Sequence, residues 1–118
     1  MIELAEKYVL HIPLYKYVDD ELVLIEIDDI LEDLISDLSE NGFENFYLTK
    51  AKAHYKSRCF DELLLTIFTT SKSPVAIFEK WFGHNNDILG QEAFGYEHAN
   101  TMIIRELMSI SRFNFYFF

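Results

Sequence analysis

The stretch FYLTKAKAHYKSRCFDELLLTIFTT, residues 46–70, decides the fold class that we expect for this chain. It is rich in β-branched and aromatic residues and divides into two strands, Phe46 to Ser57 and Phe60 to Thr70. The second strand contains the apolar run Leu63–Leu65, which is typical of a central strand covered on both faces. The residues between the strands include no Gly, Pro or Asn, so the sequence indicates the two strands without specifying a tight turn.

An amphipathic helix is predicted before these strands, over Ile27 to Asn41. Its apolar residues recur with the spacing of one helical face: Ile27, Ile30, Leu31, Leu34, Ile35 and Leu38. Asp29 and Glu32 have the spacing of a capping box, and Gly42 follows the helix as a typical C′ residue.

A second helix is predicted after the strands, with Ser73 as its N-cap and Pro74 at the first helical position. Its apolar face consists of Ile77, Phe78, Trp81 and Phe82. We expect Gly83 to end this helix and residues 84–87 to form a polar loop.

The outer segments add further elements: a strand over 8–18, a turn at Asp19–Asp20, a returning strand or extended lead over 21–27, a strand over 91–98, and a last helix beginning at Asn100 or Thr101. The order strand, helix, strand, strand, helix, strand is that of the ferredoxin-like split βαβ plan (βαββαβ). We therefore predict a single α+β domain over residues 1–118, in which two to three helices cover one face of an antiparallel sheet.

The 118 residues carry a formal charge of −10, which is unevenly distributed. Residues 1–45 contain thirteen Asp and Glu against two Lys, whereas residues 46–118 contain seven Asp and Glu against eight Lys and Arg. The single cysteine, Cys59, excludes an intramolecular disulfide. No signal-like segment opens the chain, and no apolar run approaches the roughly 20 residues of a membrane-spanning helix. We expect a cytoplasmic protein that does not bind membranes.

The predicted helix over 27–41 has an acidic outer face that no Lys or Arg at an i+4 position neutralises. Its members are Asp28, Asp29, Glu32, Asp33, Asp37 and Glu40. One interpretation is a surface that binds a basic protein, for example as a mobile-element inhibitor that occupies the basic groove of a nucleic-acid-binding protein. The other interpretation is an ordinary solvated helix face that has no partner.

Basic residues occupy every second position near the end of the first strand of the opening stretch. They are Lys50, Lys52, His54, Lys56 and Arg58. Strand side chains have a period of two, so all five are expected on one face, where they could bind a nucleic acid or another phospholigand. The alternative is an edge strand whose lysines block aggregation and pair with carboxylates such as Glu26, Asp28 or Glu62.

The sequence contains no recognisable motif for catalysis or metal binding. The histidines His11, His54, His84 and His98 lack the i, i+4 spacing of a metal site, and the glycines form no phosphate-binding loop. We therefore predict a non-enzymatic acidic interaction module with no cofactor and no metal. Its expected partner is a basic protein surface, and direct nucleic-acid binding is disfavoured by the negative charge.

The last residues of the chain, Phe113 to Phe118, read FNFYFF and are unusually apolar for a terminus. We expect this segment to pack on the chain's own core or to pair with a second copy in a homodimer.

Overall fold

The computed structural model describes residues 1–107 and confirms the predicted α+β class. The elements, in chain order, are β1 (Glu6–Pro13), β2 (Tyr15–Val18), β3 (Glu21–Leu24), α1 (Asp28–Glu40), β4 (Phe46–Tyr55), β5 (Arg58–Thr69), α2 (Val75–Leu89), β6 (Ala93–His98) and β7 (Thr101–Glu106). Neither helix in this part of the chain is long and apolar enough to cross a membrane.

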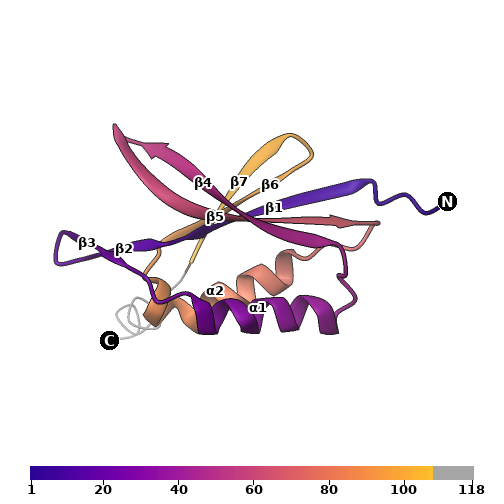
Figure 1. Cartoon of the computed structure of the whole chain (residues 1–118), viewed down its shortest axis with the longest axis horizontal. Coiled ribbons are helices and arrows are strands. Elements are labelled where there is room, and N and C mark those ends of the chain that lie inside the picture. The colour runs from indigo at the N-terminus through magenta and orange to yellow at the C-terminus, as the bar shows by residue number, and fades with distance from the viewer. Residues whose placement is uncertain (108–118) are drawn as a thin grey trace, which may run out of the picture.

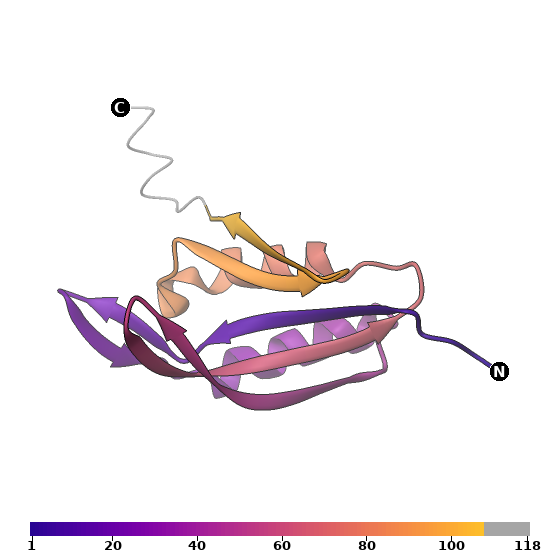
Figure 2. The same ribbon diagram turned by 90° about the horizontal axis from the view of Figure 1, so that it is seen from above.

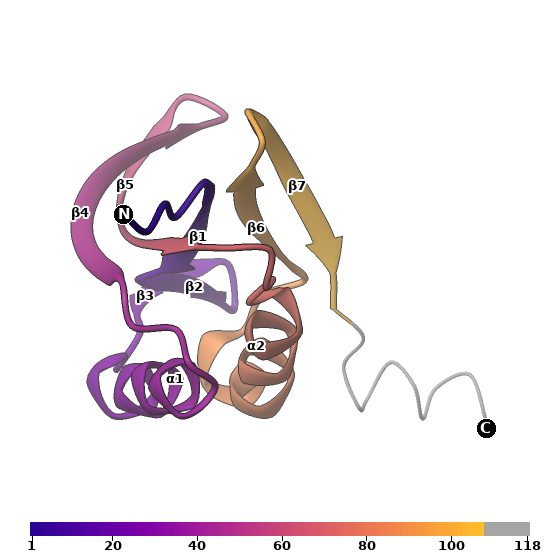
Figure 3. The ribbon, with the colours of Figure 1, turned by 90° about the vertical axis from the view of Figure 1, so that its right-hand side faces the viewer.

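Five strands form one antiparallel sheet in the order β4-β5-β1-β6-β7, and β2 and β3 form a separate hairpin. Both helices lie under the same face of the sheet (Figures 1 and 3), with α1 beneath β4 and β5 and α2 beneath β6 (Figure 2). The narrower prediction of a ferredoxin-like topology is not confirmed, because the chain adds the β2–β3 hairpin before α1 and the edge strand β7 after β6.

The central strand β1 divides its side chains between the two faces of the sheet. Tyr8, Leu10 and Ile12 point to the helices and are buried, Leu10 and Ile12 completely. His11 lies on the opposite face, which we call the open face. Residues directly opposite each other on paired strands share a face, so the pairing of β1 with β5 and β6 determines which of their side chains join His11 there.

The helices supply the other half of the core. Leu34 and Leu38 of α1 and Phe78 and Phe82 of α2 are fully buried against the sheet. Trp81 also links the helices, because its Nε1–H donates to the carbonyl oxygen of Ile30 over 2.6 Å. That bond satisfies the one polar group of a buried indole, so the aromatic ring can pack between the helices without an unpaired donor.

The ends of α1 agree only partly with the sequence prediction. Gly42 follows the helix with φ +85°, as expected of a C′ glycine. Ile27 occupies the N-cap position, and no side chain forms a capping hydrogen bond at this end of the helix. The predicted capping box of Asp29 and Glu32 therefore does not form. Both carboxylates instead lie in the exposed outer face of the helix.

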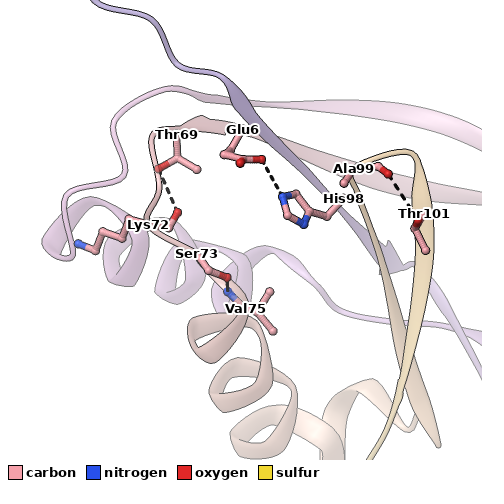
Figure 4. Close-up of polar contacts among 8 residues, drawn as sticks. All are labelled: Glu6, Thr69, Lys72, Ser73, Val75, His98, Ala99 and Thr101. Atoms are coloured by element: carbon pink, nitrogen blue, oxygen red, sulfur yellow. Dashed lines mark hydrogen bonds and ion pairs between the residues drawn. The ribbon is translucent and has the colours of Figure 1, made fainter.

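Helix α2 begins close to the predicted position, with the Val75 N–H donating to Ser73 Oγ over 3.2 Å (Figure 4), but it does not end at Gly83. It continues through residues 84–87 to Leu89 and ends at Gly90, which has φ +59°. Leu89 is completely buried. Its burial, worth roughly 2 kcal/mol, exceeds the cost of about 1 kcal/mol for a glycine inside a helix.

Three two-residue turns connect neighbouring strands: Asp19–Asp20, Lys56–Ser57 and Ala99–Asn100, each with positive φ at both residues. The last of these turns leads into β7, so the helix predicted from Asn100 or Thr101 is wrong. Thr101, Ile103 and Ile104 are β-branched residues that suit a strand, and β6 offers them a free edge. The apolar tail Phe113–Phe118 lies outside the described residues.

Replacing Phe82 with alanine tests this account of the core. The ring is completely buried, stacks on Phe94 with centroids 4.7 Å apart and meets the edge of Trp81. We expect Phe82→Ala to lower the free energy of unfolding by about 3–5 kcal/mol. Urea denaturation measures the loss, with Ile104→Ala as the control, because Ile104 is exposed and its truncation should change stability by less than about 0.5 kcal/mol. Equal effects of the two substitutions would contradict the assigned core.

Candidate functional site

Three strands bring together a histidine and two glutamates on the open face of the sheet. His11 lies on β1, Glu62 on β5 and Glu97 on β6. His11 Nδ1 lies 2.9 Å from Glu62 Oε1, and His11 Nε2 lies 2.6 Å from Glu97 Oε2. The antiparallel pairing of β1 with both neighbours produces this arrangement, since each glutamate is a diagonal cross-strand neighbour of the histidine.

The two hydrogen bonds favour the charged form of the His11 ring. A carboxylate only accepts hydrogen bonds, so a ring that donates to one from each nitrogen is an imidazolium. The hydrogen bond to Glu62 is the main cause of a raised His11 pKa; partial burial of the ring opposes it, and the bond to Glu97 and both carboxylate charges add to it. One positive and two negative charges leave this cluster with a net negative charge.

A groove of about 660 Å³ lies beside Glu62, where the β2–β3 and β4–β5 hairpins meet the segment between α2 and β6. Aromatic rings from three strands line it: Tyr15, Tyr17, Tyr55 and Phe60. Its polar side chains are Lys16, Asp61, Glu62, Gln91 and Glu92. Glu62 therefore belongs to both the groove and the cluster with His11, which makes the two features a single candidate site.

Polar contacts hold the walls of the groove together. Arg58 at the start of β5 donates from Nη1 to the Tyr17 hydroxyl of β2 over 2.5 Å, and its guanidinium lies 5.8 Å from the centre of that ring. Gln91 Nε2 donates to the carbonyl oxygens of Tyr15 and Leu89. These bonds connect both hairpins and the end of α2, so the groove has walls from three segments that are distant in sequence.

The predicted basic row does not lie on one face. Lys50, Lys52 and His54 share a face of β4, but Lys56 lies in the two-residue turn and Arg58 pairs with Tyr55 on the opposite face. The prediction of five cations on one face is wrong because the turn interrupts the period of two. The edge-strand interpretation describes β4 better: it is an edge strand, and Lys52 pairs across to Asp61 at 2.5 Å instead of to the carboxylates we expected.

The six acidic residues of α1 do share its outer side, and five are exposed while Asp37 is intermediate. Within residues 1–107 none of them forms an ion pair with a Lys or Arg of the same chain. Lys80 and His84 of α2 nevertheless line one hollow with Asp33, Asp37 and Glu40, so part of this face lies close to a cation of the chain itself. Binding of a partner by this helix stays a prediction.

A second histidine and glutamate pair lies at the other end of β1. His98 Nε2 and Glu6 Oε2 are 2.9 Å apart (Figure 4), and the His98 ring stacks on Tyr8 with centroids 3.9 Å apart. This pair differs from the His11 cluster in two ways: its histidine contacts one carboxylate, and neither residue lines the groove. Across residues 1–107, no group of three or more His, Cys, Asp and Glu side chains is placed to hold a metal ion.

The sequence matches no protein-family model and no curated protein. Its fold resembles that of a phage SAM lyase, solved in complex with S-methyl-5′-thioadenosine and in the apo state. The complex aligns with 86% of this chain and 89% of its own chain, with a TM-score of 0.51 and 11% identity. The apo structure aligns with 93% of this chain and 96% of its own, with a TM-score of 0.50 and 12% identity.

This likeness contradicts the prediction of a non-enzymatic interaction module, in both its inhibitor and its anion-binding forms. The shared fold, which extends over most of the chain, is one that an enzyme uses. The sequence reasoning also missed the cluster of His11, Glu62 and Glu97, because no spacing along the chain connects them. Glu62 is 51 residues and Glu97 is 86 residues from His11 in sequence, and only the register of three strands brings the side chains together.

The charged state of His11 predicts how stability depends on pH. Its pKa is raised in the folded protein, so the stabilisation is fully present below the unfolded value of 6.5 and is lost as pH rises through the folded value. We expect the free energy of unfolding of the wild type to exceed that of His11→Gln most at about pH 6, and this difference to disappear towards about pH 9. Urea denaturation of both proteins across this range measures the difference. A difference that does not change with pH would contradict the charged cluster.

Proposed function

We propose that this chain acts on S-adenosylmethionine as a lyase, and that the groove beside Glu62 binds the adenosyl ligand. The observation that carries the proposal is the fold, because the chain shares it over most of its length with an enzyme that acts on this substrate. One of those structures holds S-methyl-5′-thioadenosine, the adenosyl thioether that remains when the substrate loses its amino-acid arm.

The groove has the size and the walls that such a ligand needs. Its volume of about 660 Å³ lies within the usual range of roughly 300–1,000 Å³ for small-molecule sites. Tyr55 and Tyr17 offer aromatic faces on which an adenine can stack. Aromatic faces also attract a sulfonium cation. The lining thus suits both the flat base and the charged centre of the substrate.

Glu62 is the carboxylate that we assign to the sulfonium. Asp61, the neighbouring acid in the groove, is already paired with Lys52. Glu62 is largely buried, with 19% of its side chain exposed, and its Oε1 is held by His11. One oxygen of this carboxylate is already engaged by the His11 ring, so the geometry suits binding a cation better than removing a proton from carbon.

Release of S-methyl-5′-thioadenosine requires the bond between sulfur and Cγ of the arm to break, with its electron pair going to sulfur. The arm then either closes to a lactone, when its own carboxylate attacks Cγ, or becomes an alkene by losing a proton from Cβ to a base of the protein. Both routes balance without water. The first needs no base from the protein, and it neutralises a positive and a negative charge, which a groove with apolar walls favours over water.

The first test measures turnover. We expect the purified chain to convert S-adenosylmethionine to S-methyl-5′-thioadenosine, and Glu62→Gln to lower kcat/KM by roughly tenfold or more, because one charged partner of the sulfonium is removed. Chromatography with mass spectrometry detects the thioether and distinguishes a lactone from an alkene.

Glu6→Gln is the matched control for this test, because Glu6 also pairs with a histidine but lies outside the groove. It should leave kcat/KM unchanged. If the wild type neither releases the thioether from S-adenosylmethionine nor binds it, the proposed function is wrong.

The second test locates the adenine. Tyr55 and Tyr47 lie on the same face of β4 and are both exposed, but of the two only Tyr55 lines the groove. Tyr55→Ala should weaken binding of S-methyl-5′-thioadenosine by roughly 5- to 100-fold, the effect of losing one stacked base, whereas Tyr47→Ala should not. Isothermal titration calorimetry measures both affinities. Equal affinities of the two variants would place the ligand elsewhere.

A further inference from the structure

We propose that His11 is a positioning residue, which holds the Glu62 carboxylate at the edge of the groove and is itself held by Glu97. The inference rests on the proposed function and assigns to it a residue that contacts no ligand. The geometry that carries it is the chain of two hydrogen bonds, Glu97 to His11 and His11 to Glu62, which crosses the three central strands of the sheet.

His11 has no nitrogen left for a substrate, because both ring nitrogens are engaged by carboxylates. Its strand is the middle strand of the five-stranded sheet: β1 pairs on both sides, and the residues next to His11, Leu10 and Ile12, are completely buried. A ring fixed at both nitrogens and carried by a central strand can fix the partner that reaches the groove. That partner is Glu62, since Glu97 does not line the groove.

Removal of the ring would leave two carboxylates on either side of β1 with no cation between them. Like charges repel, and each carboxylate could then turn to solvent, where it is fully hydrated. Glu62 would leave the position that its bond to His11 now fixes. We therefore expect a neutral replacement of His11 to act on the reaction through Glu62.

The charged and titratable neighbours of His11 on the open face are few. On the strands that flank β1 they are Arg58, Glu62 and Glu97; on β1 itself Lys7 shares the face, and the outer strands contribute Tyr47, Tyr55 and Glu106. Only the two glutamates are within hydrogen-bond distance of the ring in the described part of the chain. Their contacts hold His11 in its charged form, so the positioning should fail as pH rises through the raised pKa of the ring.

His11→Gln and His98→Gln form a matched pair of variants. Each removes a histidine bonded to glutamate on the same sheet, but His98 is remote from the groove. We expect His11→Gln to lower kcat/KM for S-adenosylmethionine on the order of 10- to 100-fold and to abolish the fall in activity at alkaline pH. His98→Gln should retain both the rate and the pH profile of the wild type.

A measurement without substrate tests the same chain of contacts. ¹⁵N NMR of the histidine rings in the full chain should show His11 protonated at both nitrogens at neutral pH, and Glu62→Gln or Glu97→Gln should each lower its pKa. The NMR titration also tests the proposal if His11→Gln fails to fold, because Glu97→Gln removes the carboxylate that holds His11 and leaves the histidine in place.

The outcomes separate the two proposals. If the wild type releases the thioether, and His11→Gln has the same kcat/KM and the same fall in activity at alkaline pH as the wild type, the positioning role is overturned and the proposed function stands. If the wild type is inactive and binds no thioether, the proposed function fails, and the NMR titrations decide whether His11 holds the glutamates. A His11 pKa that neither glutamine variant lowers would overturn the positioning role by itself.

Discussion

The alternation of side chains along β1 is the constraint on which both the core and the candidate site depend. Tyr8, Leu10 and Ile12 point to the helices, and His11 necessarily points the other way. A shift of one residue in the register of β1 would bury His11 and expose Leu10 and Ile12. The free energy of burying those apolar side chains therefore also fixes the position of the histidine between its two glutamates.

The helices leave the open face uncovered because both of them lie on the other side of the sheet (Figure 3). Side chains on the open face thus have less apolar cover, and polar residues there can keep partial contact with solvent. The groove arises from a different feature: two hairpins extend past the helices, and Arg58 and Gln91 connect them to each other and to the end of α2. The core supplies rigidity to the His11 cluster, and the hairpins supply the walls.

Features that a short stretch of sequence determines could be predicted, and features that depend on distant pairing could not. The apolar period of residues 27–38 and the alternation of residues 46–70 are local patterns, and both gave the correct elements. The end of α2 depended on whether Leu89 finds a buried place in the core, which is a tertiary fact. The prediction that the five basic residues share one face is wrong at Lys56 and Arg58, because a two-residue turn without Gly or Asn is difficult to recognise in a sequence.

The candidate site shows the same limit at the level of function. His11 is separated from Glu62 by 51 residues and from Glu97 by 86, so no motif could have indicated the cluster. The acidic excess of the chain is nevertheless a physical signal, because negative charge attracts a small cation as well as a basic protein surface. For the proposed reaction, a net charge of −10 favours the approach of a sulfonium cation. The thioether that forms has lost that positive charge, so the attraction that gathers the substrate does not retain the product.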